Sequence, residues 1–208
     1  FIRVLPGPLA DFSYGKICIP DTSTFIDKSK IMAGYNIVSW FWDFGAGGTS
    51  TSQNPIYSFF SDEVYNVTLT VTSDSGCVDS VSKSIFVNNR PKASLIFNEV
   101  CLPDTSTFID NSTVSNDIIS TWIWDFGDGF KDTIKNAKHI YSLEGNYTVV
   151  LVVIPPNGCS DTSSNPFTVY PAPLVDFNTT AECFTDSAFF YDNSSISIGS
   201  IGSWEWQF

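Results

Sequence analysis

Residues Trp122–Gly129 read Trp-Ile-Trp-Asp-Phe-Gly-Asp-Gly, and this stretch decides the fold. Trp122, Trp124 and Phe126 share one parity, so a strand here places three aromatic rings on the same face. The glycines that follow can take a positive φ, so the strand is expected to end in a tight turn. Related stretches occur at Trp40–Gly45 and Trp204–Phe208. Because an inner strand of a two-sheet sandwich needs large side chains, the predicted core aromatics are Trp40, Trp42, Phe44, Trp122, Trp124 and Phe126.

A second motif repeats at the same interval. Cys18–Asp27 recurs as Cys101–Asp110 and, more loosely, as Cys183–Asp192, about 82 residues apart. Such a period is itself the size of a domain, so the chain is predicted to be a tandem array of whole domains. The expected boundaries are residues 1–6 for the last strand of a preceding repeat, 7–89 for a first domain, 90–171 for a second and 172–208 for a truncated third.

The pattern between these motifs is typical of β-structure. Tyr65, Val67, Leu69 and Val71 alternate with polar residues, which predicts a strand with one buried face. The 208 residues include 18 Phe, 8 Tyr and 6 Trp, and no apolar spacing of helical period extends beyond a turn or two. The predicted fold class is therefore all-β.

Charge and apolar runs exclude two classes of partner. Ten Lys and Arg against 22 Asp and Glu give a net charge of −12, which repels nucleic acids and anionic membranes. No run of 18 apolar residues is present, so membrane insertion of this segment is not expected.

The residues also disfavour catalysis and metal chemistry. His139 is the single histidine, so no nucleophile–base pair can recur in both repeats, and the prediction is that the chain is not an enzyme. No Cys-x-x-Cys pair is present for a sulfur-bound metal. Calcium is the cation left open, through Asp125 and Asp128, but Ala46 stands at the position of Asp128 in the first repeat. No other cofactor is expected.

The stretch Trp122–Gly129, followed by Tyr141 and by alternating Tyr147, Val149, Leu151 and Val153, resembles the polycystic kidney disease (PKD) domain. The resemblance covers essentially the whole chain, although Gln207 replaces the motif aspartate in the third repeat. It implies immunoglobulin-like β-sandwiches of about seven strands, arranged head to tail as a rod. Arrays of this kind are similar to parts of giant adhesins and gliding-associated surface proteins exported by type IX secretion.

The expected function is that of structural spacer repeats in a large extracellular, cell-surface adhesin or filament. They would hold a distal binding region away from the cell and bear load, with neighbouring repeats as their partners and surface polysaccharide or protein ligands bound by other regions. The alternative is that they are accessory modules with which a secreted hydrolase engages polysaccharide or collagen. Direct ligand binding by the repeats would require exposed aromatic residues on one face.

Two cysteine pairings remain open. The five cysteines fit two per repeat, with the third repeat truncated, and an extracellular location would oxidise them. Pairing within repeats joins Cys18 to Cys77 and Cys101 to Cys159. In the immunoglobulin-like order, however, Cys18 and Cys77 fall at opposite ends of a sandwich, whereas a disulfide needs Cα atoms within ~7 Å. A head-to-tail array favours Cys18–Cys159, which leaves Cys77, Cys101 and Cys183 for partners outside this sequence.

Three short stretches resemble the O-glycosylation signal of some gliding bacteria. Each has Asp before Ser or Thr, and the candidate acceptors are Ser80, Thr133 and Ser187.

Overall fold

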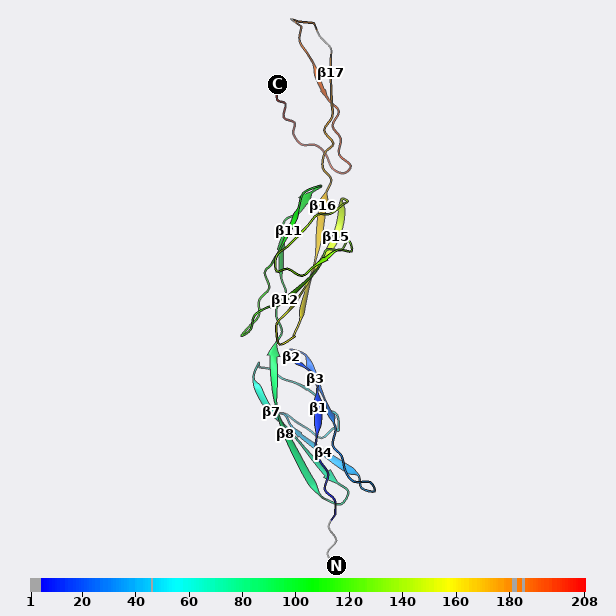
Figure 1. The fold of residues 1–208 in the computed structure, drawn as a ribbon, viewed down its shortest axis with the longest axis vertical. Coiled ribbons are helices and arrows are strands. Elements are labelled where there is room, and N and C mark those ends of the chain that lie inside the picture. Colours follow the sequence, from blue (N-terminus) through cyan, green and yellow to red (C-terminus); the bar gives the residue numbers. More distant parts are fainter. Residues whose placement is uncertain (1–4, 46, 181–182, 185) are drawn as a thin grey trace, which may run out of the picture. The chain divides into compact units, whose positions relative to one another are not determined.

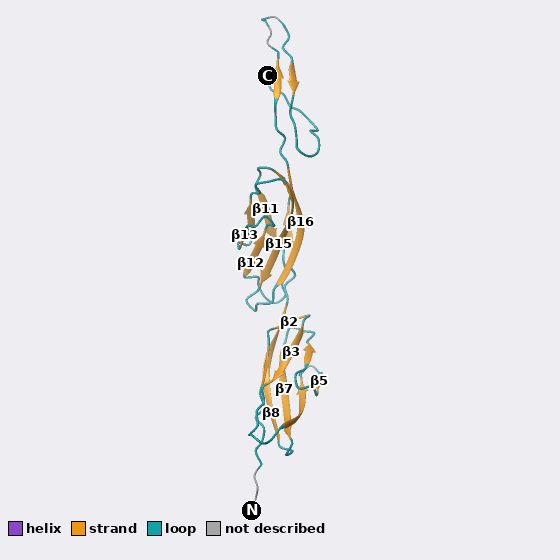
Figure 2. Cartoon of the chain, turned by 90° about the vertical axis from the view of Figure 1, so that its right-hand side faces the viewer, coloured by secondary structure: helices purple, strands orange, loops and turns teal. Residues whose placement is uncertain are grey.

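The computed structural model describes residues 5–45, 47–180, 183–184 and 186–208. Most of the strand expected at residues 1–6 therefore lies outside the described residues, and Leu5 and Pro6 are not in a strand. All regular structure in the described ranges is β-strand (Figure 2), as predicted from the sequence. Within those ranges, no helix could span a membrane.

Contacts divide the chain into two compact units. The first comprises Phe1–Lys92 together with two later segments, Val114–Ser120 and Ile154–Asp161. The second comprises Ala93–Thr113, Thr121–Val153 and Thr162–Phe208.

The first sandwich is built from strands β1 to β8 (Figure 1). One sheet has three strands in the order β1-β3-β6, which are Phe12–Tyr14, Thr22–Asp27 and Ile56–Ser58. The other has five in the order β2-β8-β7-β4-β5, which are Ile17–Ile19, Val78–Asn89, Val64–Ser73, Ile37–Asp43 and Thr49–Ser50. The long antiparallel pair of β7 and β8 is visible in Figure 1.

The core lies between these sheets because the alternating strand turns its apolar face inward. Val67, Leu69 and Val71 on β7 are fully buried. They pack in one cluster with Phe25 of β3 and Trp42 of β4. The predicted alternation of this strand is confirmed.

The second sandwich repeats the arrangement with β9 to β16. Its three-stranded sheet has the order β14-β11-β9, which are Ala137–His139, Ser106–Asp110 and Leu95–Phe97. Its five-stranded sheet has the order β10-β16-β15-β12-β13, which are Val100–Cys101, Asp161–Tyr170, Gly145–Ile154, Thr121–Asp125 and Lys131–Asp132. The third repeat contributes the two-stranded pair β17 (Phe177–Thr179) and β18 (Phe190–Asp192).

Each complete sandwich has eight described strands, where about seven were expected, because its first strand is split. In the first sandwich β1 pairs antiparallel with β3 in the small sheet. The chain then changes sheets, and β2 pairs in parallel with the end of β8, with Cys18 opposite Asn88. Cys18, which was expected at one end of a sandwich, therefore lies in a short strand of its own.

The glycine after the aromatic strand is required by its surroundings. Gly127 has a φ of +82°, and a Cβ there would lie 2.7 Å from the backbone oxygen of Thr148. The equivalent Gly45 has a φ of +70° and a Cβ there would lie 2.7 Å from the backbone oxygen of Asn66. Both the conformation and the close approach of backbone from the neighbouring strand exclude a side chain.

The expectation that all six aromatics are core residues is wrong for two of them. Trp42 and Trp124 are fully buried, and Phe44 and Phe126 are nearly so, but Trp40 and Trp122 are only partly buried. The reason is polar: Trp40 Nε1 donates to Asp27 Oδ2 at 2.8 Å, and Trp122 Nε1 donates to Asp110 Oδ2 at 2.8 Å. A ring held to a carboxylate in this way sits at the rim of the core.

Candidate functional site

The most distinctive local structure is a disulfide in the first unit. It joins Cys18 on β2 to Cys159 in the segment Ile154–Asp161, with an S–S distance of 2.03 Å and a Cα–Cα distance of 5.7 Å. Cys159 is 1% exposed, and its sulfur lies 4.0 Å from the carbonyl oxygen of Ile17. The bond therefore closes a covalent loop across a sequence separation of 141 residues.

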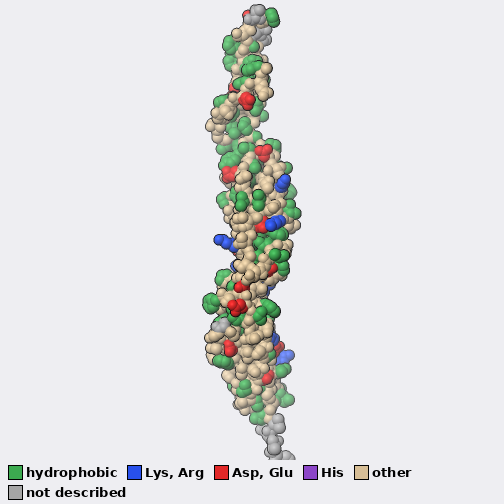
Figure 3. All heavy atoms as spheres, turned by 90° about the vertical axis from the view of Figure 1, so that its left-hand side faces the viewer, with side chains coloured by type: hydrophobic (Ala, Val, Ile, Leu, Met, Phe, Trp, Pro, Cys, Tyr) green, Lys and Arg blue, Asp and Glu red, His purple; other side chains and the backbone are tan. Residues whose placement is uncertain are grey.

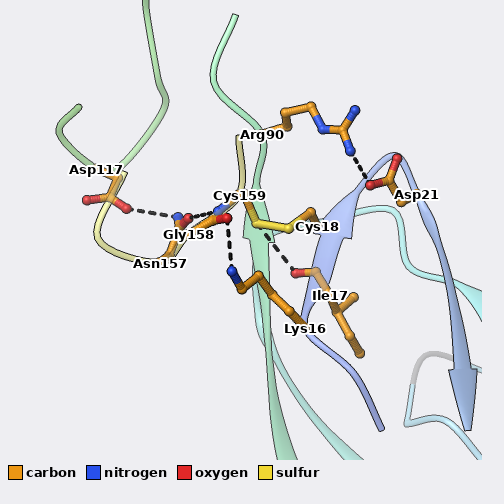
Figure 4. The surroundings of a disulfide bond; sticks show 9 residues. All are labelled: Lys16, Ile17, Cys18, Asp21, Arg90, Asp117, Asn157, Gly158 and Cys159. Carbon is orange, nitrogen blue, oxygen red and sulfur yellow. Dashed lines mark hydrogen bonds and ion pairs between the residues drawn. A yellow bond between two sulfur atoms is a disulfide. The ribbon is translucent and has the colours of Figure 1, made fainter. Parts of the chain in front are cut away.

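Polar contacts fix the Cys159 side of this bond (Figure 4). Lys16 Nζ donates to the Gly158 carbonyl oxygen at 2.9 Å, and the Cys159 amide donates to Asn157 Oδ1 at 2.8 Å. Asn157 Nδ2 in turn donates to Asp117 Oδ2 at 2.8 Å. Figure 4 shows the Lys16 side chain directed at the Gly158 carbonyl oxygen and the Asn157 side chain directed at Asp117, so contacts from two other segments hold the turn.

Further contacts in the first unit fix the surroundings of Cys18. The Asp21 amide donates to the Cys18 carbonyl oxygen at 2.8 Å, and the Asp21 carboxylate forms an ion pair with Arg90. Asn116 Nδ2 donates to Asp62 Oδ2 at 2.9 Å from a backbone with a φ of +55°. Asparagine tolerates this left-handed conformation better than most residues, which suits it to this position.

The alternative pairing within repeats does not occur in the structure. Cys77 and Cys101 are free thiols, the first partly buried and the second exposed. Cys183 is also a free, exposed thiol.

His139 lies in a packed aromatic stack rather than in an open cleft. Its ring stacks on Phe126 at a centroid distance of 4.3 Å and meets Tyr141 edge-on at 4.6 Å. Its Nε2 lies 2.6 Å from Asp128 Oδ2. Tyr57 takes the same place in the first sandwich and stacks on Phe44 at 4.0 Å, so this position serves packing in both repeats.

The carboxylates considered for calcium are engaged with protein groups. Asp125 accepts a hydrogen bond from the Gly127 amide at 3.0 Å and forms an ion pair with Lys131 at 3.1 Å. The Gly127 amide, followed by Lys131, lowers the pKa of Asp125 below its ordinary value. Among the described residues no group of three or more His, Cys, Asp or Glu side chains could hold a metal ion.

The candidate glycosylation residues have exposed side chains. Ser80 lies on β8, Thr133 directly follows β13, and Ser187 belongs to the third repeat. The Asp132 carboxylate accepts hydrogen bonds from the amides of Thr133 and Ile134, at 2.6 and 3.2 Å.

An apolar groove with an aromatic lining lies within the third repeat. It encloses about 380 Å³ and is lined by Phe177, Phe190 and Trp206 among others. Trp206 is 38% exposed, whereas its equivalents Trp42 and Trp124 are fully buried. Phe177 and Phe190 lie on the paired strands β17 and β18, so this groove lies beside the two-stranded sheet.

One face of the molecule shows how its charged side chains are distributed. On the face drawn in Figure 3, Lys and Arg side chains are few and scattered, and hydrophobic side chains form separate groups. This agrees with a net charge of −12.

The sequence analysis missed the residues that support the disulfide. Lys16, Asn157 and Asp117 do not themselves recur at the equivalent positions of the other repeat, so neither periodicity nor motif spacing marks them. A glycine directly before each late cysteine, Gly76 and Gly158, was the available signal, because it predicts a turn that presents the sulfur.

Comparison with known proteins places these repeats in a family. The sequence model for the PKD domain matches residues 7–87 and 88–169, which together form most of the chain.

Three curated relatives contain related segments. The pre-pro-metalloprotease PrtV of Vibrio cholerae serotype O1 (strain M66-2) is 35% identical over 130 residues, which is 61% of this chain and 14% of the relative. A microbial collagenase of Vibrio alginolyticus is 32% identical over 76 residues, 36% of this chain and 9% of that protein. Collagenase ColQ1 of Bacillus cereus (strain Q1) is 36% identical over 67 residues, 32% of this chain and 7% of that protein.

A solved structure shows the same likeness. The PKD1 domain of the Vibrio cholerae metalloprotease PrtV is 29% identical, with a TM-score of 0.37, and the match covers 38% of this chain and 96% of that domain.

Proposed function

Because this chain belongs to the PKD domain family, we propose that its repeats are structural spacers of a large extracellular, cell-surface adhesin or filament. They hold a distal binding region away from the cell and carry load along the chain. Binding of surface polysaccharide or protein ligands is assigned to other regions of such a protein, and catalysis is not assigned to these repeats. Gliding motility and type IX secretion are the setting that the repeat pattern suggests.

The observation that carries this proposal is the Cys18–Cys159 disulfide. Its loop contains all the strands from β3 to β15, which make up most of both sandwiches. A force applied at the two ends of the chain passes through the sulfur–sulfur bond and bypasses everything between Ile19 and Gly158. A covalent force path of this kind is not needed for ligand binding, but it directly serves a spacer that carries load.

An extracellular location is supported by the same bond. Disulfides form and persist in oxidising compartments such as the cell exterior, and are rare where thiols are kept reduced. Exposed Ser80, Thr133 and Ser187 are accessible to glycosylation in that setting.

Single-molecule stretching of the chain tests the load-bearing role. With the disulfide intact, unfolding should release only the residues outside the loop. After reduction, the 141-residue separation should add roughly 470 to 510 Å of extended chain, at about 3.3 to 3.6 Å per residue. An equal extension under oxidising and reducing conditions would contradict the proposal.

The second candidate function is that of accessory modules of a hydrolase. It is favoured by the relatives, since two are named collagenases and one is named a metalloprotease. Co-sedimentation of the chain with insoluble collagen and with insoluble polysaccharides tests it. Saturable binding by the oxidised chain favours the accessory role, whereas no retention above a non-binding protein control favours the spacer.

A further inference from the structure

The first half of the disulfide motif occurs in two complete repeats with the same backbone geometry. Cys18 lies on β2, which pairs in parallel with the end of β8, and Cys101 lies on β10, which pairs in parallel with the end of β16. The amide of the third residue after each cysteine donates to its carbonyl oxygen, at 2.8 Å in both repeats. Cys183 receives the same hydrogen bond, from Asp186 at 3.0 Å.

The second half of the motif is also present twice. Cys77 and Cys159 each follow a glycine of positive φ, +80° at Gly76 and +77° at Gly158. Each glycine amide donates to a carbonyl oxygen three residues earlier, at 2.9 Å in the first repeat and 2.8 Å in the second. The glycine turn before each cysteine is therefore similar, although Ser73 also donates its amide to the Cys77 carbonyl oxygen at 2.9 Å and Pro155, its equivalent, has no amide hydrogen for such a bond.

One copy of each half is bonded and the other is not. Cys18 is joined to Cys159, whereas Cys101 is an exposed thiol and Cys77 a partly buried thiol. A Cβ at Gly158 would meet Lys16 Nζ at 2.2 Å, but a Cβ at Gly76 would meet no heavy atom within 4 Å. Lys16 thus covers the glycine of the Cys159 turn, whereas no other described residue covers the glycine of the Cys77 turn.

A contact that does not involve the cysteines repeats as well. In the first unit Asn116 donates to Asp62, and in the second unit Ser197 Oγ donates to Glu144 Oε1 at 2.7 Å. Glu144 follows Asp62, and Ser197 follows Asn116, by about one repeat period. A loop of the third repeat therefore contacts the second repeat at the position where a loop of the second contacts the first.

We propose that Cys101 is the attachment point for a disulfide from the Gly-Cys turn of a following PKD repeat. By the same rule, Cys77 bonds the early cysteine of a preceding repeat. The early cysteine of each repeat then joins the late cysteine of the next, as Cys18 joins Cys159. This connectivity goes beyond the proposed spacer role and does not depend on it.

Formation of each bond is an oxidation. The two thiols lose two protons and two electrons as the sulfur–sulfur bond forms, and the oxidant is a disulfide reagent or a disulfide oxidoreductase. That disulfide accepts the electrons and protons and is reduced to two thiols.

One support of the first bond is not repeated at Cys101. The residue equivalent to Lys16 is Glu99, which accepts a hydrogen bond from the Tyr170 hydroxyl at 2.7 Å. A carboxylate cannot donate to a carbonyl oxygen, so the strand and the turn alone must position the sulfurs at this second junction.

The test completes the third repeat from the chain's own sequence. Residues 127–171 are appended after Phe208, so that Trp206-Gln207-Phe208 continues as Trp124-Asp125-Phe126 does. The protein is oxidised in glutathione buffer and mapped by non-reducing peptide mass spectrometry. The expected disulfides are Cys18–Cys159 and Cys101 with the appended copy of Cys159, while Cys77 and Cys183 stay reduced. A bond from the appended cysteine to Cys183, or no bond from it, overturns the proposal.

Folding of the added repeat is read from Trp206, whose 38% exposure should fall as quencher access is lost. If the repeat does not fold, a mixture of two variants of the present chain, Cys101→Ser and Cys77→Ser, decides instead. One is labelled with heavy nitrogen, and the predominant cross-link in the mixture should join Cys77 of one chain to an early cysteine, Cys101 or Cys183, of the other. No link from Cys77 to either early cysteine, or a predominance of links between two early cysteines, overturns the proposal.

Discussion

The Asp27 carboxylate accepts hydrogen bonds both from a backbone amide and from side chains. Its Oδ1 accepts the Ser29 amide at 2.9 Å, while its Oδ2 accepts Trp40 Nε1 at 2.8 Å and Gln53 Nε2 at 3.1 Å. Burial raises the pKa of Asp27, but the hydrogen bonds from Ser29, Gln53 and Trp40 outweigh it, so the pKa lies below its ordinary value. The residue that ends a strand thus also ties the small sheet to the aromatic strand.

This lowered pKa predicts how the first sandwich responds to acid. A carboxyl group with a lower pKa in the folded state stabilises the fold above its unfolded pKa of ~3.9, and that stabilisation is lost as the pH falls through the folded value. Asp27→Asn should therefore lower the free energy of unfolding at pH 7 and flatten its decline below pH ~4. Urea unfolding across this pH range measures both effects. The matched control is Glu63→Gln at an exposed carboxylate; an equal change in both variants would contradict the assignment.

Trp124 is a second residue with a specific expectation. It is fully buried and lies 6.0 Å from Phe108 between ring centroids. Trp124→Ala should destabilise the second sandwich by ~3 to 5 kcal/mol, because it removes a large buried side chain and leaves a cavity. Ile123→Ala, at the adjacent 37% exposed position, is the control and should cost far less. Chemical denaturation measures both, and similar losses would show that the core assignment is wrong.

At the scale of elements, the sequence predicts those strands and turns that depend on short-range sequence patterns. The alternating strand, the aromatic strand and the glycine turn were all predicted, because each depends on neighbours within a few residues. The split first strand was not predicted, since β2 pairs with β8 across most of a repeat. The partial burial of Trp40 was missed for a similar reason: its partner Asp27 lies on a strand of the other sheet.

The turn glycine gives a prediction at this scale. Gly127→Ala places a methyl group 2.7 Å from the Thr148 oxygen at a φ of +82°. It should cost ~2 to 5 kcal/mol, since left-handed strain adds to the displacement of packed backbone. Gly129→Ala also has a positive φ but no neighbour within 4 Å, so it should cost only ~1 to 2 kcal/mol. Thermal unfolding distinguishes the two, and equal costs would exclude a role for the close contact.

At the scale of the whole molecule, the covalent loop should govern stability. Closing a loop of 141 residues lowers the entropy of the unfolded chain by an amount worth ~5 kcal/mol at room temperature. Cys18→Ser should therefore reduce the free energy of complete unfolding by up to that amount in guanidinium chloride. Cys101→Ser alters an exposed free thiol and should change it little. Equal stability of Cys18→Ser and the unaltered chain would contradict this prediction.

The same loop changes what a protease can achieve. The connection between the two PKD repeats contains Lys92, which is exposed, and cleavage after it would ordinarily release two fragments. Because Cys18 and Cys159 lie on opposite sides of such a cut, the pieces stay joined through sulfur. A single peptide-bond cleavage anywhere between these cysteines therefore releases no part of the molecule. In surroundings rich in proteolytic enzymes, the protein can be cleaved once within the loop and still remain a single covalently linked molecule.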